Sequence, residues 1–368
     1  MSAASRVRVR VLDSGKAGGD HFEFNRGVLE ALRGAGADVT FHGWRSMTAA
    51  HAPVMAEPAA GVAGRVRARP YSLAGVEDLP TRWGRAATKL GSLWPTFNAL
   101  RGRDRLVVAY AAPVSHVLLA LSSRWRRAPT VVFLHAEVEF LNSGLGPRLV
   151  GEKLMTLALR LASPRLRYLM LTDEGVRVLR ERGGTRARLA FCPHPMSDRV
   201  FAAPAGPVAT PRAGAFAMIK KAADVAAVRQ LLRGLPGSAH GTGVDAGPTA
   251  CRFNGEGVIE AGDTDADAVL ARKRFLSREA LEAGLRAARW FLFPPGPSEY
   301  ALTASGLACS AAAAGARVIG QDNAFMRTYA AQYPQAFSIA GAPEASMPGE
   351  AVDNLAQLAD VLLAADGG

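Results

Sequence analysis

Residues 290–320 read WFLFPPGPSEYALTASGLACSAAAAGARVIG, and this stretch decides the fold class. Its first four residues are continuously apolar, as in a strand buried on both faces, and a loop rich in Pro and Gly follows them. Residues 304–314 are small and suit a helix that ends at Gly315, and residues 317–319 form a second short strand. The stretch predicts strand, loop, helix and strand in succession, which is the repeating unit of a parallel α/β sheet.

The same alternation runs through most of the chain. In the first half we expect strands at 7–12, 39–42, 106–110, 130–134, 168–171 and 189–191, with helices at 22–32, 114–121, 147–161 and 173–181. Residues 51–96 are rich in Pro, Gly and Arg and are left unassigned. In the second half we expect a strand at 215–219 and helices at 222–232, 278–288 and 350–363, besides the stretch above.

A Pro-rich segment without hydrophobic periodicity lies between Phe201 and Gly214 and is typical of an interdomain connection. We therefore predict two Rossmann-like α/β domains, residues 1–204 and 205–368. In such sheets ligands bind at the carboxyl ends of the strands, so we expect the two domains to face a common cleft.

The charge is distributed unevenly along the 368 residues. The net charge is +12, but residues 1–200 hold 30 Lys and Arg against 16 Asp and Glu, whereas the remainder holds 14 against 16. Such asymmetry points to an anionic partner for the first half, either an acceptor substrate or an anionic membrane surface. The alternative to an anionic partner is that an arginine-rich composition has drifted without a functional cause. No RNP, KH or zinc pattern accompanies the charge, so a nucleic-acid partner is not expected.

Cysteine content and the N-terminal sequence bear on the compartment. The three cysteines stand at long spacings, which supports neither a disulfide framework nor a cysteine zinc site. No apolar stretch has the length of a signal peptide or a membrane span. We expect a cytoplasmic protein, with peripheral attachment to the inner face of the plasma membrane as an option. Because Asp263, Asp265 and Asp267 read as a solvated loop, we expect no metal and no cofactor.

Two loops of the first half carry groups that suit a binding site. Gly18, Gly19 and His21 follow the first strand, where the backbone can approach a ligand and helix amides can hold an anion or a sugar hydroxyl. A tight turn is the alternative for this loop. His135 and the carboxylates Glu137 and Glu139 follow the strand at 130–134. His135 can orient a sugar hydroxyl and either glutamate can accept a proton, whereas a turn or core histidine is the structural alternative.

The second half offers groups that suit a diphosphate. Lys220 and Lys221 follow its first strand, and a lysine binds phosphate as a point charge, although solvated lysines at a helix start are equally compatible. Thr303, Ser305 and Gly306 open the small-residue helix, whose free amides and hydroxyls suit an anion. Close packing against the sheet is the other reason for small residues in this helix.

These motifs, in their order and spacing, resemble the nucleotide-sugar glycosyltransferases of the GT-B fold, especially the large retaining family of bacterial mannosyl- and glucosyltransferases, glycosyltransferase group 1. The resemblance rests on the Gly18-Gly19 loop, Leu134-His135, Leu171-Thr-Asp-Glu174, Pro193-His194-Pro195 and the donor segment from Tyr300 to Ile319. The resemblance implies that the first domain binds the acceptor and the second binds the sugar nucleotide. It implies donor contacts from Lys220, Lys221, Glu299, Tyr300, Thr303, Ser305, Gly306 and Ser310, with His135 near the transferred sugar.

One departure from the family pattern divides the functional hypotheses. Leu302 and Ser310 occupy the two positions at which the family usually has glutamates, and a serine holds ribose hydroxyls less strongly than a carboxylate does. We expect a retaining hexosyltransferase that acts on a glycan or lipid-linked acceptor in bacterial surface polysaccharide or glycolipid synthesis. The alternative is a catalytically degenerate GT-B-like protein that acts as a binding or assembly partner.

Overall fold

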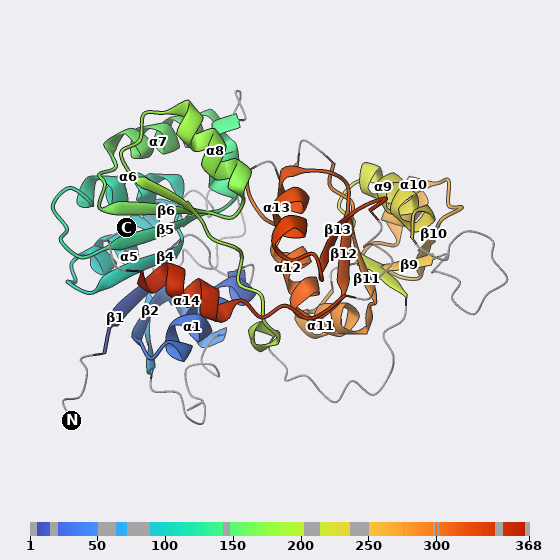
Figure 1. Cartoon of the computed structure of the whole chain (residues 1–368), viewed down its shortest axis with the longest axis horizontal. Helices are drawn as coiled ribbons and strands as arrows, with labels where there is room; N and C mark the ends of the chain where they lie inside the picture. Colours follow the sequence, from blue (N-terminus) through green and yellow to red (C-terminus); the bar gives the residue numbers. More distant parts are fainter. Residues whose placement is uncertain are drawn as a thin grey trace. The chain divides into compact units, whose positions relative to one another are not determined.

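The computed structural model describes residues 6–14, 21–50, 64–71, 89–142, 148–201, 214–235, 250–274, 276–296, 299–300, 302–342 and 349–364. The chain divides into two compact units (Figure 1). The first comprises Met1–Pro195 together with Asn354–Gly368, and the second comprises Met196–Asp353. The expected connection at residues 202–213 lies outside the described residues.

The first unit is built on a parallel seven-stranded sheet in the order β3-β2-β1-β4-β5-β6-β7. Its strands are β1 (Arg8–Asp13), β2 (Asp38–Trp44), β3 (Val66–Tyr71), β4 (Arg105–Tyr110), β5 (Thr130–Leu134), β6 (Leu166–Met170) and β7 (Arg188–Phe191). Its helices are α1 (Phe22–Gly34), α2 (Arg45–Ala50), α5 (Leu93–Leu100), α6 (Pro113–Ser122), η2 (Ala136–Asn142), α7 (Arg148–Leu161), α8 (Asp173–Arg182) and α14 (Leu355–Leu363). The strand order reverses direction beside β1, as in a doubly wound Rossmann-like sheet.

The second unit is built on a six-stranded sheet in the order β10-β9-β8-β11-β12-β13, with β10 antiparallel to β9. Its strands are β8 (Ala215–Ala217), β9 (Ala250–Phe253), β10 (Val258–Glu260), β11 (Trp290–Phe293), β12 (Arg317–Gly320) and β13 (Phe337–Ile339). Its helices are η3 (Asp198–Val200), α9 (Ala222–Arg233), α10 (Ala266–Ala271), α11 (Arg278–Ala287), α12 (Gly306–Ala313) and α13 (Ala324–Gln332). The predicted fold class, an α/β protein with two Rossmann-like sheets, is confirmed.

The last helix differs from the expectation. We placed residues 350–363 in the second domain, but α14 packs against α1 of the first unit (Figure 1). Arg105 Nη1 donates to the carbonyls of Leu362 and Ala364 at 2.8 and 3.0 Å, and Arg167 Nη1 donates to Val361 O at 3.0 Å. Both arginines lie at the carboxyl end of α14, where a positive charge is favourable beside the helix dipole. The helix therefore completes the first unit.

The stretch at residues 290–320 folds as its pattern indicates. β11 is completely buried, and β8 and β12 flank it in parallel register. Helix α12 is buried from Ala308 to Ala313, and Ala308, Ala311 and Ala312 have no exposed surface. Close packing in the core therefore accounts for the small residues of this helix, because a larger side chain would have no room there.

Candidate functional site

The carboxyl edge of the first sheet gathers three histidines around one phenylalanine. His21 begins the turn into α1, His135 follows β5, and His194 follows β7. The ring of Phe24 lies 4.4 Å from that of His135 and 4.9 Å from that of His194, and the rings of His21 and His135 are 5.0 Å apart. Parallel strands bring these residues together although more than 170 positions separate the first from the last. Two of the three, His21 and His135, are among the predicted site residues.

Asp13 adds a carboxylate to this cluster, and the sequence analysis missed it. It is the last residue of β1 and completely buried. Its Oδ2 accepts a 2.7 Å hydrogen bond from Asn25 Nδ2 and lies 3.8 Å from His21 Nδ1. The side chain of His21 remains 14% exposed, with the Asp13 carboxylate beside it. The sequence signal for Asp13 was its position as an acidic residue at the end of a hydrophobic strand.

His135 is held as a neutral hydrogen-bonding group. Its Nε2 lies 2.8 Å from Ala109 O, which makes Nε2 the protonated nitrogen and leaves Nδ1 as an acceptor. Burial, with a smaller contribution from the charge of His21, lowers the pKa of His135 to about 3. The ring is therefore uncharged at neutral pH, and its Nδ1 can accept a hydrogen bond from a sugar hydroxyl.

Glu137 is turned into the protein and does not face a ligand. It is 1% exposed, its Oε1 accepts the backbone N–H of His135 at 3.0 Å, and His116 Nε2 lies 3.4 Å away. Burial opposes ionisation of Glu137, but the hydrogen bond and the charge of His116 outweigh it, so the pKa is lowered overall. Glu137 thus positions His135. Glu139 is half-buried on η2, and Gly18 and Gly19 lie outside the described residues.

The second unit has a pocket of about 410 Å³ at the carboxyl edge of its sheet. Lys221 Nζ donates to Glu299 Oε1 at 2.5 Å, and Glu299 Oε2 accepts from Gly296 N at 3.1 Å. Asp224 Oδ2 receives the backbone N–H groups of Lys220 and Lys221 at 2.6 and 3.1 Å. Lys221 is exposed, and its bond to Glu299 raises its pKa and lowers that of Glu299. The structure thus joins two predicted residues, Lys221 and Glu299, in one pocket.

Five other predicted donor residues follow Glu299 on its loop and on α12, but they do not line this pocket: Tyr300, Thr303, Ser305, Gly306 and Ser310. Tyr300 has a φ of +55°, and its ring lies 5.2 Å from that of Phe293 in the core. Ser305 Oγ caps α12 by accepting from Ala308 N at 3.3 Å, Gly306 begins the helix, and Thr303 and Ser310 are 8% and 7% exposed. Asp224 and Gln321 line the pocket and were not predicted. The capping position of Asp224 in α9 was the available signal for it.

Within the described part of the chain, no helix has the length and hydropathy needed to cross a bilayer. No three metal-ligating side chains cluster there either.

Comparisons with known proteins support the architecture. No family model matches the sequence, and no curated protein matches it significantly. Among solved structures, sucrose-phosphate synthase from Thermosynechococcus elongatus is similar at 12% identity and a TM-score of 0.53, over 98% of this chain and 90% of that one. HepE from Anabaena, in complex with UDP and glucose, is similar at 12% identity and a TM-score of 0.51, over 97% and 89%. The chain therefore has the GT-B fold, with two Rossmann-like domains, that glycosyltransferases of this type share.

Proposed function

We propose that this protein is a glycosyltransferase that moves a hexose from a nucleotide-diphosphate sugar to a glycan or lipid-linked acceptor. The Lys221–Glu299 pair in its pocket, within a GT-B fold, is the observation that carries the proposal. HepE, which shares the fold, was solved with UDP and glucose, and this favours a UDP-sugar as the first donor to test. We place the donor in the second unit and the acceptor in the first.

The charges of the pocket suit a departing diphosphate. Glu299 compensates Lys221 in the free protein, and a diphosphate would take the place of the carboxylate against the ammonium group. Lysine charge at the leaving group stabilises the negative charge that develops as the glycosidic bond breaks. We propose Lys220, which is exposed beside Lys221, as a second cation for the same phosphates.

The first unit supplies hydrogen bonds to the acceptor or the sugar. His135 would accept a hydrogen bond from a hydroxyl group at Nδ1, and His21, beside Asp13, would contact the acceptor hydroxyl. If His21 deprotonated that hydroxyl for direct displacement of the diphosphate, the anomeric configuration would invert. We propose retention, as the family resemblance implies, and an inverted product in an NMR assay would contradict it.

A transfer assay with a panel of UDP-, GDP- and dTDP-sugars tests the activity. We expect turnover with at least one donor, and a Lys220→Ala/Lys221→Ala variant should lose about 10- to 100-fold because each lysine makes charge-assisted bonds. Lys153→Ala is the matched control, since Lys153 is an exposed lysine on α7 of the other unit, and should leave turnover unchanged.

A binding protein without turnover is the second candidate. Leu302 and Ser310 carry no carboxylate that could hold a ribose, and they are only 1% and 7% exposed. This reading predicts no turnover with any donor of the panel. A melting screen distinguishes a protein that binds a donor from one that does not, because a bound nucleotide sugar raises the apparent stability even where no reaction follows. Melting shifts without turnover would favour the second candidate, and neither shifts nor turnover would contradict the donor site.

We also propose a role in bacterial surface polysaccharide or glycolipid synthesis, with a cytoplasmic location on the inner face of the plasma membrane. The support is the basic character of the first 200 residues. Flotation with phosphatidylglycerol vesicles should recover the protein, and salt should abolish recovery. Equal recovery with neutral vesicles would contradict this attachment.

A further inference from the structure

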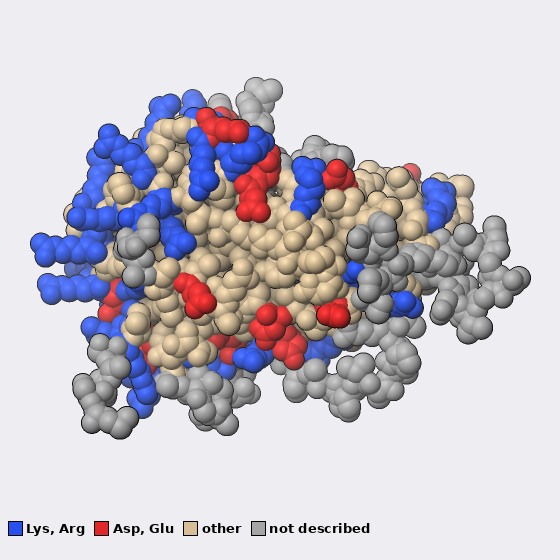
Figure 2. Space-filling model, in the orientation of Figure 1, with Lys and Arg blue, Asp and Glu red and all other residues tan. Residues whose placement is uncertain are grey.

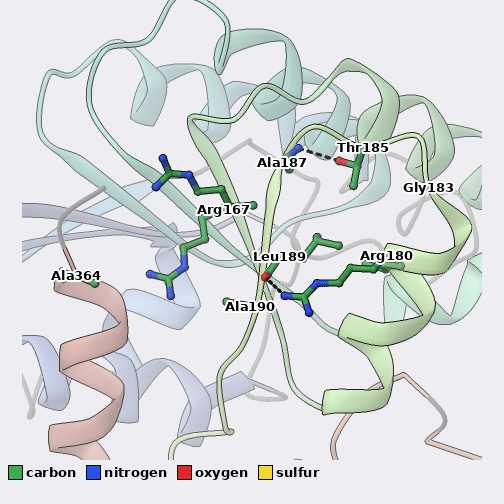
Figure 3. Close-up of a pocket in the computed structure, with 10 residues that line it drawn as sticks. Arg167, Arg180, Gly183, Thr185, Ala187, Leu189, Ala190 and Ala364 are labelled. Atoms are coloured by element: carbon green, nitrogen blue, oxygen red, sulfur yellow. Dashed lines mark hydrogen bonds between the residues drawn. The ribbon is translucent and has the colours of Figure 1, made fainter. Parts of the chain in front are cut away.

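A pocket of about 610 Å³ opens in the first unit around β7, at the amino edge of the sheet (Figure 3). Its ten described lining residues include three arginines and no acidic residue: Arg167, Leu179, Arg180, Gly183, Thr185, Ala187, Arg188, Leu189, Ala190 and Ala364. A volume of this size accommodates a small organic ligand. The pocket is thus both large enough for a ligand and positively charged.

Backbone carbonyls hold two of the three guanidinium groups in place. Arg167 is the second residue of β6, and its Nη1 donates to Val361 O of α14 at 3.0 Å. Arg180 reaches from α8 to β7, where its Nη2 donates to Leu189 O at 3.2 Å (Figure 3). Arg188 begins β7 and stands directly opposite Arg167 in the strand register. Three arginines from three elements therefore line one pocket, with Arg167 extending toward the side of Ala364 and Arg180 on the other side of β7 (Figure 3).

The pocket is separate from the candidate site of the first unit. Arg167 and Arg188 stand at the starts of their strands, whereas His135 and His194 follow strand ends. β6 has five residues, which at about 3.3 Å per residue places roughly 16 Å between the two edges of the sheet. A ligand in the arginine pocket would not contact the histidine cluster.

Two further arginines lie close to the pocket. Arg105 Nη1 donates to the carbonyl of the lining residue Ala364 at 3.0 Å, and Arg186 is exposed in the turn before β7. Figure 2 shows Lys and Arg side chains gathered over the first unit, along the side where α5 and α6 lie. Such a field raises the local concentration of anions. The excess charge of the first half is therefore concentrated in part at the amino edge, away from the histidine cluster.

We propose that this pocket binds a phosphate-bearing ligand. The planar guanidinium fork matches two phosphate oxygens at once, and a set of three in one cavity suits a phosphate or diphosphate group better than a single carboxylate. The non-phosphate part of the ligand would rest on Leu179, Leu189 and Ala190. Two sources share this chemistry, a soluble phosphate compound and the headgroup of a phospholipid.

Titration calorimetry with pyrophosphate on the full chain tests the site. Arg180→Gln/Arg188→Gln removes two lining charges from exposed positions, and Arg186→Gln is the matched control, because it removes the same charge two residues from Arg188 without lining the pocket. We expect the double variant to bind at least about tenfold more weakly, since each charge-assisted bond is worth that much. The Arg186→Gln variant should bind as the wild type does. Arg188→Lys should be intermediate, because it keeps the charge but loses the fork.

Further arms identify the source of the ligand and the outcomes that overturn the proposal. Because pyrophosphate can also occupy the proposed donor pocket of the second unit, the titrations are repeated in a Lys220→Ala/Lys221→Ala background, where binding at the arginine pocket should persist. Complete loss of binding in that background would place the anion in the second unit and refute the site. An equal loss in Arg186→Gln would show only non-specific attraction and would also refute it. Vesicles containing phosphatidic acid, tested with the same variants, distinguish a headgroup from a soluble phosphate. Absence of binding to both pyrophosphate and these vesicles would overturn the proposal.

Discussion

The acid sensitivity of the first unit should depend on buried histidines, and His42 allows the cleanest test. It lies in β2, completely buried, with Nδ1 2.6 Å from the hydroxyl of Tyr71 in β3. Burial, with smaller contributions from the charges of Arg10 and Arg69, lowers the pKa of His42 to about 4. In the unfolded chain a histidine titrates near about 6.5. Between these values the unfolded chain binds more protons than the folded one, so acidification favours unfolding.

The size of the effect follows from the two pKa values. At pH 7.5 the histidine is neutral in both states and contributes no pH-dependent cost. At pH 5 the unfolded state is favoured by about 2 kcal/mol through His42 alone. A domain of ordinary stability has about 5–15 kcal/mol, so this loss is measurable.

Urea unfolding at pH 7.5 and pH 5, followed by fluorescence, measures the loss for the wild type and for His42→Asn. Trp44, two residues away and 1% exposed, provides a local probe. The asparagine keeps a polar atom near Tyr71 but cannot titrate, so the loss between the two pH values should shrink by about 2 kcal/mol. Tyr71→Phe is the control: it removes the hydrogen bond but leaves the buried ring, and its pH-dependent loss should persist. An unchanged loss in His42→Asn would refute the assignment.

Three further predictions concern packing and buried groups. Glu137→Ala should lower the free energy of unfolding by about 1–3 kcal/mol in urea titrations, because it leaves the backbone N–H of His135 without its buried acceptor. Glu137→Gln keeps an acceptor oxygen and should cost less; equal costs would contradict this hydrogen bond. Burial raises the pKa of Cys192, Cys251 and Cys309. A thiol reagent should therefore label none of these cysteines in the native protein at pH 8 and all of them in guanidinium. Fast labelling of the native protein would contradict their burial. Gly349→Ala should lower the free energy of unfolding by about 1–3 kcal/mol in urea titrations, because the added Cβ would lie 2.5 Å from the backbone nitrogen of Arg317. An unchanged unfolding midpoint would contradict this steric conflict.

Most strands and helices were predictable because their apolar patterns are local. β5 and β11 were predicted with the bounds that the structure shows, since a strand buried on both faces must be continuously apolar. β3 was missed, because four of its six residues are exposed and it contains two arginines and a proline. Among the described strands it pairs with β2 alone, and such an edge strand tolerates a polar sequence.

The candidate site was predictable in part. A histidine directly after a buried strand lies at the carboxyl edge of a parallel sheet, which is why His135 could be singled out. The sequence did not indicate that the Glu137 side chain is buried, because its partner His116 lies on a different helix. The Lys221–Glu299 pair likewise joins residues 78 positions apart, and no local pattern indicates that they meet.

The sequence by itself determined the α/β class, the two Rossmann-like halves and the basic character of the first, since these depend on local periodicity and composition. Only the tertiary structure decided that α14 belongs to the first unit, that Asp13 stands beside His21, and that arginines from separate strands line one pocket. The physical reason is that a pattern specifies which face of an element is buried but not which element covers it. Parallel strands then bring distant residues to a common edge of the sheet.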